Sequence, residues 1–200
     1  MATNLQSPPI PISRNSKYTT TTTRTLDLRC HDRHFRDAVV CDENGDKLFD
    51  FTAKDLGTSW TLRRSLIDRK SGDHILDLRH TKTSYKSWIL EDSTGNEVSK
   101  IKDVTRGNGF TAVDVQVLAN DGDSTVELRS FDRTGRRTSF LVDGRVVAEM
   151  TLTDNNDAAF LHKRGLDRTT WRLEVAEGVD IALAVALAFA RAEISHAWRR

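Results

Sequence analysis

The segment VDIALAVALAFARAEI, Val179 to Ile194, is the only long apolar stretch in the sequence, and it decides what fold can form around it. Its uninterrupted apolar run, Ile181 to Ala190, would make about 15 Å of helix at ~1.5 Å per residue, against a membrane hydrocarbon core of ~30 Å. The run is therefore too short to span a bilayer. Its alanines favour a helix, and Asp180 suits the helix N-terminus. Because large residues alternate with alanines, they cover every side of this helix, and a helix that is apolar all round must be buried all round.

The chain that precedes this segment has the pattern of antiparallel strands. It contains no proline between residues 24 and 176, and its apolar residues alternate with polar ones, as in Val113, Val115 and Val117. Such alternation places one face of a strand in a core and the other in water. About a dozen short strands predict a mainly β fold, an antiparallel closed barrel of about twelve strands wrapped around a hydrophobic C-terminal helix at about residues 179–196.

The turns between these strands share a motif in which an aspartate precedes a glycine: Asp42 to Gly45, Asp68 to Gly72, Asp92 to Gly95, Asp132 to Gly135 and Asp143-Gly144. The aspartate can accept a hydrogen bond from the backbone two residues on, and the glycine takes the positive φ that closes a hairpin. DENGD also imitates the start of an EF-hand calcium loop, but the twelfth position is Ala53 rather than glutamate. The motif therefore predicts hairpins rather than calcium sites.

The N-terminal residues 1–23 have a different composition from the rest of the chain. All three prolines fall here, beside serines and the threonine run Thr19 to Thr23, and no apolar segment has the form of a secretory signal. Such a composition buries little apolar surface to offset its ordering entropy, which predicts a disordered or loosely attached tail. The barrel is then expected to occupy residues 24–200. As an alternative, Tyr18 to Thr23 have the strand propensity to lie along a sheet edge.

Length, charge and cysteine content limit the function classes. The chain has 200 residues, enough for one domain, and its 30 lysines and arginines against 29 acidic residues give a formal charge of +1. No global field therefore attracts nucleic acid, and none is expected as a partner; any anion site must be a local patch. Two cysteines, Cys30 and Cys41, are too few for a disulfide framework. We expect a cytoplasmic protein, with a nuclear or peripheral membrane location as alternatives.

Four segments of the sequence resemble one known family: VVCDENGDKLFDF, SLIDRKSGDHILDLR, SWILEDSTGNEVSKIK and WRLEVAEGVDIALAVALAFA. They look like successive segments of the LURP-one-related proteins, which belong with the tubby C-terminal and phospholipid scramblase-like domains. The resemblance covers about Thr25 to Ile194 and implies a twelve-stranded barrel with a hydrophobic helix through its centre. The chain departs from the family in having Ala176-Glu177 where a proline often precedes the glycine. It also has Arg191 early in the helix, which should make the far mouth of the barrel more polar.

The sequence offers no recognisable catalytic constellation. It has no G-x-S-x-G elbow and no G-x-x-x-x-G-K-S/T loop, and RGNGF at Gly107 and Gly109 lacks the third glycine of a dinucleotide site. A metal pair from His31 and His34, with Cys30, lacks a second cluster of ligands, and solvated histidines are the favoured interpretation. A barrel filled by its own helix also leaves no interior cavity for a substrate. We therefore expect no enzyme, no catalytic residue, no metal and no cofactor.

Surface arginines are the best candidates for a binding function. The resemblance to tubby proteins implies recognition of phosphoinositide or other anionic phospholipid headgroups through basic surface residues. The densest cluster is Arg133, Arg136 and Arg137 around Gly135, because a tight turn would point the three arginines into solvent together. We expect Lys163 and Arg164 near this cluster. Arginine forks suit phosphate oxygens. Charged side chains at hairpins are more often simply solvated, so the plain alternative stands beside this hypothesis.

Two further basic clusters and one other class of function stay open at the level of sequence. The clusters are Arg63/Arg64 with Arg69/Lys70, and Lys163/Arg164 with Arg168. The other class is a protein-interaction scaffold, or a signalling or defence adaptor without lipid binding, because LURP-one-related members are linked to defence signalling in plants. The sequence indicates no protein partner for such a scaffold.

Overall fold

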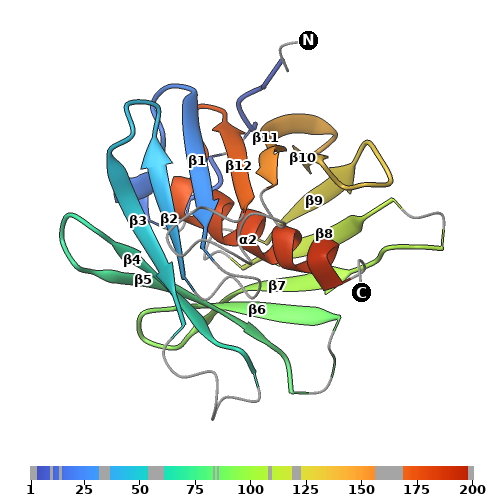
Figure 1. Ribbon diagram of the computed structural model, residues 1–200, viewed down its shortest axis with the longest axis horizontal. Helices are drawn as coiled ribbons and strands as arrows, with labels where there is room; N and C mark the ends of the chain where they lie inside the picture. The colour runs from blue at the N-terminus through green and yellow to red at the C-terminus, as the bar shows by residue number, and fades with distance from the viewer. Residues whose placement is uncertain are drawn as a thin grey trace.

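The structure is a computed structural model that describes residues 4–9, 11–13, 15–31, 37–53, 61–82, 84, 86–107, 110–118, 123–155 and 169–197. Its described residues form a closed barrel of antiparallel strands around one long helix (Figure 1). Each strand pairs with its neighbours in sequence, and β1 closes the barrel by pairing with β12. The barrel and core helix predicted from the sequence are confirmed.

The elements are, in chain order, η1 (Ser16–Tyr18), β1 (Arg24–Cys30), β2 (Asp37–Asp42), β3 (Lys47–Thr52), β4 (Arg64–Asp68), β5 (His74–His80), β6 (Ser87–Asp92), β7 (Glu97–Asp103), β8 (Ala112–Val117), β9 (Ser124–Ser130), β10 (Arg137–Val142), β11 (Arg145–Asn155), β12 (Thr169–Val175) and α2 (Ile181–Ala197).

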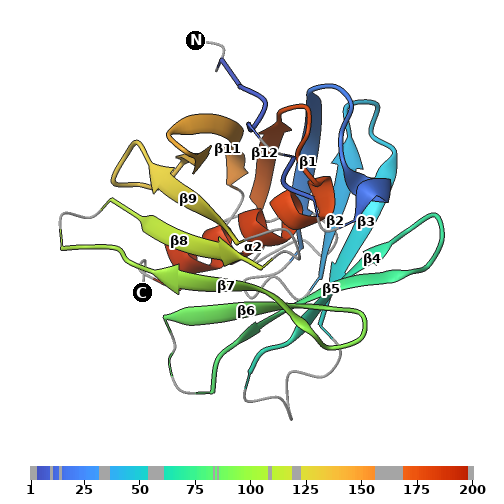
Figure 2. The ribbon, with the colours of Figure 1, turned by 180° about the vertical axis from the view of Figure 1, so that it is seen from behind.

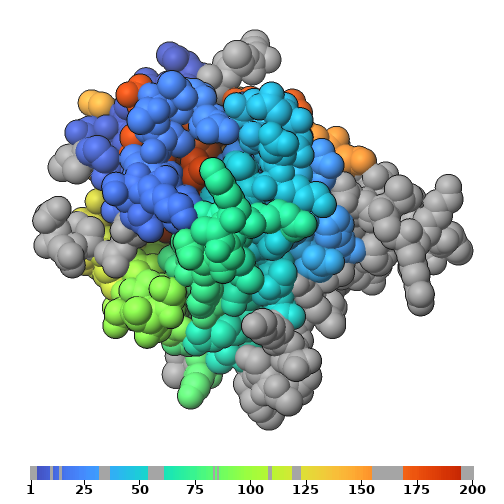
Figure 3. Space-filling model, turned by 90° about the vertical axis from the view of Figure 1, so that its left-hand side faces the viewer, coloured from blue at the N-terminus to red at the C-terminus, as the bar shows by residue number. Residues whose placement is uncertain are grey.

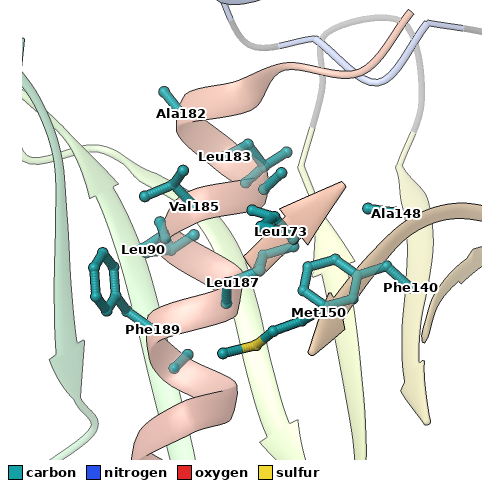
Figure 4. Close-up of a cluster of buried hydrophobic side chains, with 14 of the residues drawn as sticks. Leu90, Phe140, Ala148, Met150, Leu173, Ala182, Leu183, Val185, Leu187 and Phe189 are labelled. Atoms are coloured by element: carbon teal, nitrogen blue, oxygen red, sulfur yellow. The ribbon is translucent and has the colours of Figure 1, made fainter. Parts of the chain in front are cut away.

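The strands place their apolar residues toward the helix in rows that cross the sheet. Leu26 of β1 lies opposite Leu173 of β12, which in turn lies opposite Met150 of β11, and all three are 0% exposed. Register is fixed by this burial, because a slip of one residue would turn each apolar row outward. Figure 4 shows Leu173 and Met150 reaching toward Leu187 of α2.

Helix α2 is buried on every side along most of its length. Residues 182–192 are all buried, as its all-round apolar sequence predicted. Phe189 stacks on Phe51 of β3 with ring centroids 4.2 Å apart (Figure 4 shows Phe189). Asp180 caps the helix, since its Oδ1 accepts hydrogen bonds from the backbone N–H of Ala182 and Leu183. Among the described residues, no helix is both long and apolar enough to cross a membrane.

The two open ends of the barrel are distinguished by the ends of α2. At the entry mouth, where α2 begins, lie the β2–β3, β4–β5, β6–β7, β8–β9 and β10–β11 turns; at the exit mouth, where α2 ends, lie the β3–β4, β5–β6, β7–β8 and β9–β10 connections. Glu193 near the helix end contacts Arg64, His80 and Trp88, which are the exit-mouth ends of β4, β5 and β6. Successive connections of an up-and-down barrel therefore alternate between two separate surfaces.

The aspartate turns form as the sequence predicted. In the first of them Asp42 Oδ1 accepts a hydrogen bond of 2.9 Å from the backbone N–H of Asn44. Asp68 and Asp92 likewise accept a hydrogen bond from the backbone N–H of the residue two positions later in the chain. Asp143 and Gly144 both have positive φ, 49° and 74°, which is the geometry of a two-residue hairpin turn that follows the twist of its strands.

The N-terminal segment differs from the predicted loose tail. Its described part crosses the entry mouth beside the start of α2 (Figure 2). Ile12 and Tyr18 are buried, 6% and 7% exposed, and the Tyr18 hydroxyl donates to Asp68 Oδ2 at 2.9 Å. The backbone of Thr20 accepts from Gly178 N–H, and Thr20 N–H donates to the carbonyl of Val179. The segment is anchored because it forms hydrogen bonds with the backbone N–H and C=O groups of the turn before α2. The composition of the segment itself does not reveal these long-range bonds.

Candidate functional site

The β9–β10 turn, which carries the predicted arginine patch, is folded around Asp132. Asp132 accepts hydrogen bonds from the backbone N–H of Arg136 and Arg137 at 3.1 and 3.0 Å and from the hydroxyl of Thr134. Burial raises the pKa of Asp132, but the hydrogen bonds from Thr134, Arg136 and Arg137 outweigh it and leave the pKa below its usual value. The carboxylate is thus occupied by the turn itself.

The three arginines of this turn have different environments. Arg137 is committed to the barrel wall: its Nε and Nη2 donate to the carboxylate of Glu149 on β11 at 2.6 and 2.9 Å, and this raises its pKa. Arg133 and Arg136 are exposed, and within the described part of the chain no ion pair involves either side chain. The structure therefore gives two available guanidinium groups at this turn, where the sequence predicted three.

Two other residues of the predicted patch, Lys163 and Arg164, lie outside the described residues, as does Arg168. The second basic cluster is not a joint surface. Arg63 bridges Asp77 and Glu91 on the outer wall, and Arg69 pairs with Asp50. Its neighbour Arg64 points to the barrel interior and is 1% exposed.

Exposed charge is distributed unequally between the two mouths of the barrel. In the described entry-mouth connections the exposed carboxylates are Glu43, Asp46, Asp73, Asp123, Asp143 and Glu177. In the described exit-mouth connections the exposed cations, apart from the paired Arg63, are Lys82, Lys86, Arg106, Arg133 and Arg136. Asp132 is the one carboxylate in those described connections. The described entry-mouth connections also carry the exposed cations Arg69 and Lys70. Among the described connections, carboxylates therefore outnumber cations at the entry mouth, and cations outnumber carboxylates at the exit mouth.

The exit mouth also carries exposed aromatic side chains that the sequence analysis did not select. Phe131 and Phe110 are 61% and 37% exposed, in the β9–β10 and β7–β8 connections. The guanidinium carbon of Arg137 lies 5.3 Å from the centre of the Phe131 ring. The topology of the barrel could have indicated these residues. When successive connections are assigned alternately to the two ends of an up-and-down barrel, the connections with Phe110, Phe131 and the exposed arginines lie at the same end.

The interior near the exit mouth holds a buried polar network. Glu193 Oε2 accepts from Arg64 Nη2 at 2.6 Å and from Trp88 Nε1 at 3.1 Å, while Oε1 accepts from His80 Nε2 at 3.0 Å. Burial would raise the pKa of Glu193, but the charge of Arg64 and the hydrogen bond from His80 outweigh it and lower the pKa to about 2. Arg191 is also fully buried, with Nη2 donating to the Gly135 carbonyl at 3.4 Å. This network joins the helix end to the wall.

Two of the histidines, His74 and His80, are placed in structural contacts. His74 contacts Asp77 at 2.8 Å and His80 contacts Glu193, so both serve carboxylates of the barrel. His34, the second member of the suggested metal pair with His31, lies outside the described residues. Among the residues that the structure describes, no group of three or more His, Cys, Asp or Glu side chains is placed to hold a metal ion.

A hollow of about 520 Å³ opens at the entry mouth. It lies between the N-terminal segment, the β4–β5 and β6–β7 hairpins and the start of α2, and Figure 3 shows the blue N-terminal segment beside the green β4–β5 hairpin on this side of the molecule. Its lining includes Asn15, Lys17, Asp73, Asp92 and Asp180. Lys17 is already paired with Asp68 and Asp73, and Asp180 caps α2. The surplus of carboxylates makes this hollow unsuitable for an anionic ligand.

The described molecule is thus a twelve-stranded β-barrel with a helix as its core. A profile of the LURP-one-related family matches residues 24–192, and the chain belongs to this family. The fold is similar to the X-ray structure of a protein from Arabidopsis thaliana, with a TM-score of 0.63 and 18% sequence identity over 90% of this chain and 96% of that chain. This level of identity shows a shared fold alone. No curated protein matches the chain.

Proposed function

We propose that this protein is a non-catalytic binding module for anionic phospholipid headgroups, including phosphoinositides, and that its exit mouth faces the membrane surface. The observation that carries the proposal is the unequal distribution of exposed charge, with an excess of cations on the described exit-mouth connections and an excess of carboxylates on the described entry-mouth turns. Arg133 and Arg136 supply the first contacts, because no other described residue neutralises them. Lys163 and Arg164 belong to the same proposal on the basis of sequence.

The proposed mode of binding is electrostatic and weak for any single cation. A basic residue near an anionic membrane surface contributes about 1 kcal/mol, and the attraction falls off within a Debye length. Guanidinium groups add forked hydrogen bonds to phosphate oxygens. A cytoplasmic protein of this kind would associate reversibly with the anionic inner leaflet.

Replacing Arg133 and Arg136 together by serine tests the proposal. We expect the affinity for vesicles of phosphatidylcholine with phosphatidylserine or phosphoinositide to fall about 30-fold, because two contributions of about 1 kcal/mol are lost. The melting temperature should change little, since both side chains are exposed and unpaired in the described chain. Arg137 is left intact, because its loss would also break the contact with Glu149.

The matched control is the double variant Lys47→Ser/Lys70→Ser, which removes the same charge from exposed residues at the entry mouth. It should bind vesicles like the parent protein. If the parent does not bind anionic vesicles at low salt, or if both double variants lose affinity equally, lipid recognition by the exit mouth is wrong. A protein-interaction scaffold without lipid binding then becomes the better account.

A further inference from the structure

The exposed large apolar side chains of the described chain are gathered at one end. They are Leu62, Phe110 and Phe131, and all three lie in connections at the exit mouth, none at the entry mouth. Single exposed apolar residues are ordinary on protein surfaces. Here their position is informative because they share the end that carries the exposed cations.

Phe110 and Phe131 are close neighbours on this rim. The β8–β9 ladder pairs Ala112 with Arg129, and beyond it Ser130 N–H donates to the Thr111 carbonyl at 3.0 Å. Phe110 and Phe131 are the next residues outward on the two chains. The two residues therefore lie just beyond the exit-mouth end of the β8–β9 ladder, and both are exposed.

The Phe131 ring has a fixed support although it is 61% exposed. Arg137 lies beside the ring and is itself held by two hydrogen bonds to Glu149. Arg106 follows β7 in the same connection as Phe110, and Arg133 and Arg136 follow Phe131. The rim thus presents two aromatic rings set among three exposed guanidinium groups, with Asp132 occupied by its own turn.

This combination fits the surface of an anionic bilayer. Cations are drawn to the headgroups, while exposed aromatic and apolar side chains can enter the boundary between headgroups and acyl chains. On the basis of the proposed function, we propose that Phe131 and Phe110 form a wedge that inserts into the bilayer once the arginines have engaged the headgroups. Binding would then have an electrostatic part and an apolar part, which respond differently to salt.

The test compares the parent protein with Phe110→Ser/Phe131→Ser on vesicles of phosphatidylcholine and phosphatidylserine, by co-sedimentation at low and high salt. The double variant should bind at least 10-fold more weakly than the parent at low salt. At high salt, where surface charge is screened, the parent should retain measurable binding and the variant none. Two single variants with Phe110 unchanged complete the test. Phe131→Leu, which keeps an apolar side chain, should retain most of the parent's affinity for the vesicles, whereas Phe131→Ser should lose it.

A soluble inositol phosphate separates headgroup recognition from insertion. The double phenylalanine variant should bind it like the parent, because the arginines are unchanged, and its melting temperature should stay close to that of the parent. Vesicle binding equal to that of the parent at both salt concentrations would overturn the wedge while leaving lipid recognition intact. Failure of the parent to bind any anionic vesicle would instead overturn the proposed function on which the wedge depends.

Discussion

Leu187→Asp should abolish folding of the barrel. Leu187 lies in the middle of α2 and is 2% exposed, so the variant places a carboxylate among apolar side chains with no described partner (Figure 4). The cost combines the lost burial of about 1.5 to 3 kcal/mol with several kcal/mol for an unpaired buried charge. Because a domain of this kind has about 5 to 15 kcal/mol of stability in total, little or none should remain.

The same substitution at an exposed leucine is the control. Leu62 is 37% exposed, and its positive φ of 47° suits aspartate better than leucine, so Leu62→Asp should change stability by no more than about 0.5 kcal/mol. Circular dichroism with urea titration distinguishes the two variants. A cooperative transition of Leu187→Asp at the parent midpoint would contradict a helix that forms the core.

Arg64→Met should produce the second large loss, about 3 to 5 kcal/mol. Arg64 is 1% exposed and pairs with Glu193 at 2.6 Å, so its removal leaves a buried carboxylate without its cation. Arg64→Met/Glu193→Gln should recover much of this loss, because glutamine needs no counter-charge and can still accept from Trp88. Arg63→Met is the matched control: Arg63 is exposed on the outer wall, and its loss should cost about 1 kcal/mol or less. A loss for Arg64→Met no larger than that of the control would show that the buried pair is unimportant.

Glu193 also sets an expectation for acid. Its pKa is lowered to about 2 in the folded protein from 4.5, so its carboxylate stabilises the fold at pH values above about 4.5. That contribution is lost as the pH falls from about 4.5 to 2. The stability difference between the parent and Glu193→Gln should therefore shrink over this interval in urea titrations. A difference that is constant from pH 7 to pH 2 would mean that Glu193 does not titrate in this range.

Much of the fold could be predicted because its causes are local. Period-two alternation defines a buried face for each strand, and an all-round apolar helix requires a closed sheet about it. The inward orientation of Arg64 follows the same rule: residues two apart in a strand face the same side, and Leu66 faces the core, whereas Arg63 faces outward. Because adjacent residues of a strand point to opposite faces, Arg63 and Arg64 cannot form one basic cluster.

Other features depend on contacts that sequence spacing does not reveal. The pair of Arg137 and Glu149 arises from the β10–β11 register, which shifts at a bulge between Phe140 and Leu141. The anchoring of Ile12 and Thr20 depends on the turn before α2, more than 150 residues away in the chain. Long-range pairing of this kind has no local signal, so the N-terminal segment looked like a tail.

The most direct test of the proposed function is to find which mouth of the barrel meets an anionic bilayer. A fluorescent probe is attached at Gly107→Cys on the exit mouth or at Ser93→Cys on the entry mouth; both sites are exposed, and the native Cys30 and Cys41 are buried. Quenching by neutral acrylamide is measured with and without anionic vesicles. We expect the vesicles to protect the probe at residue 107 and to leave the probe at residue 93 accessible. Equal accessibility at both positions, or protection at residue 93 alone, would contradict a membrane-facing exit mouth.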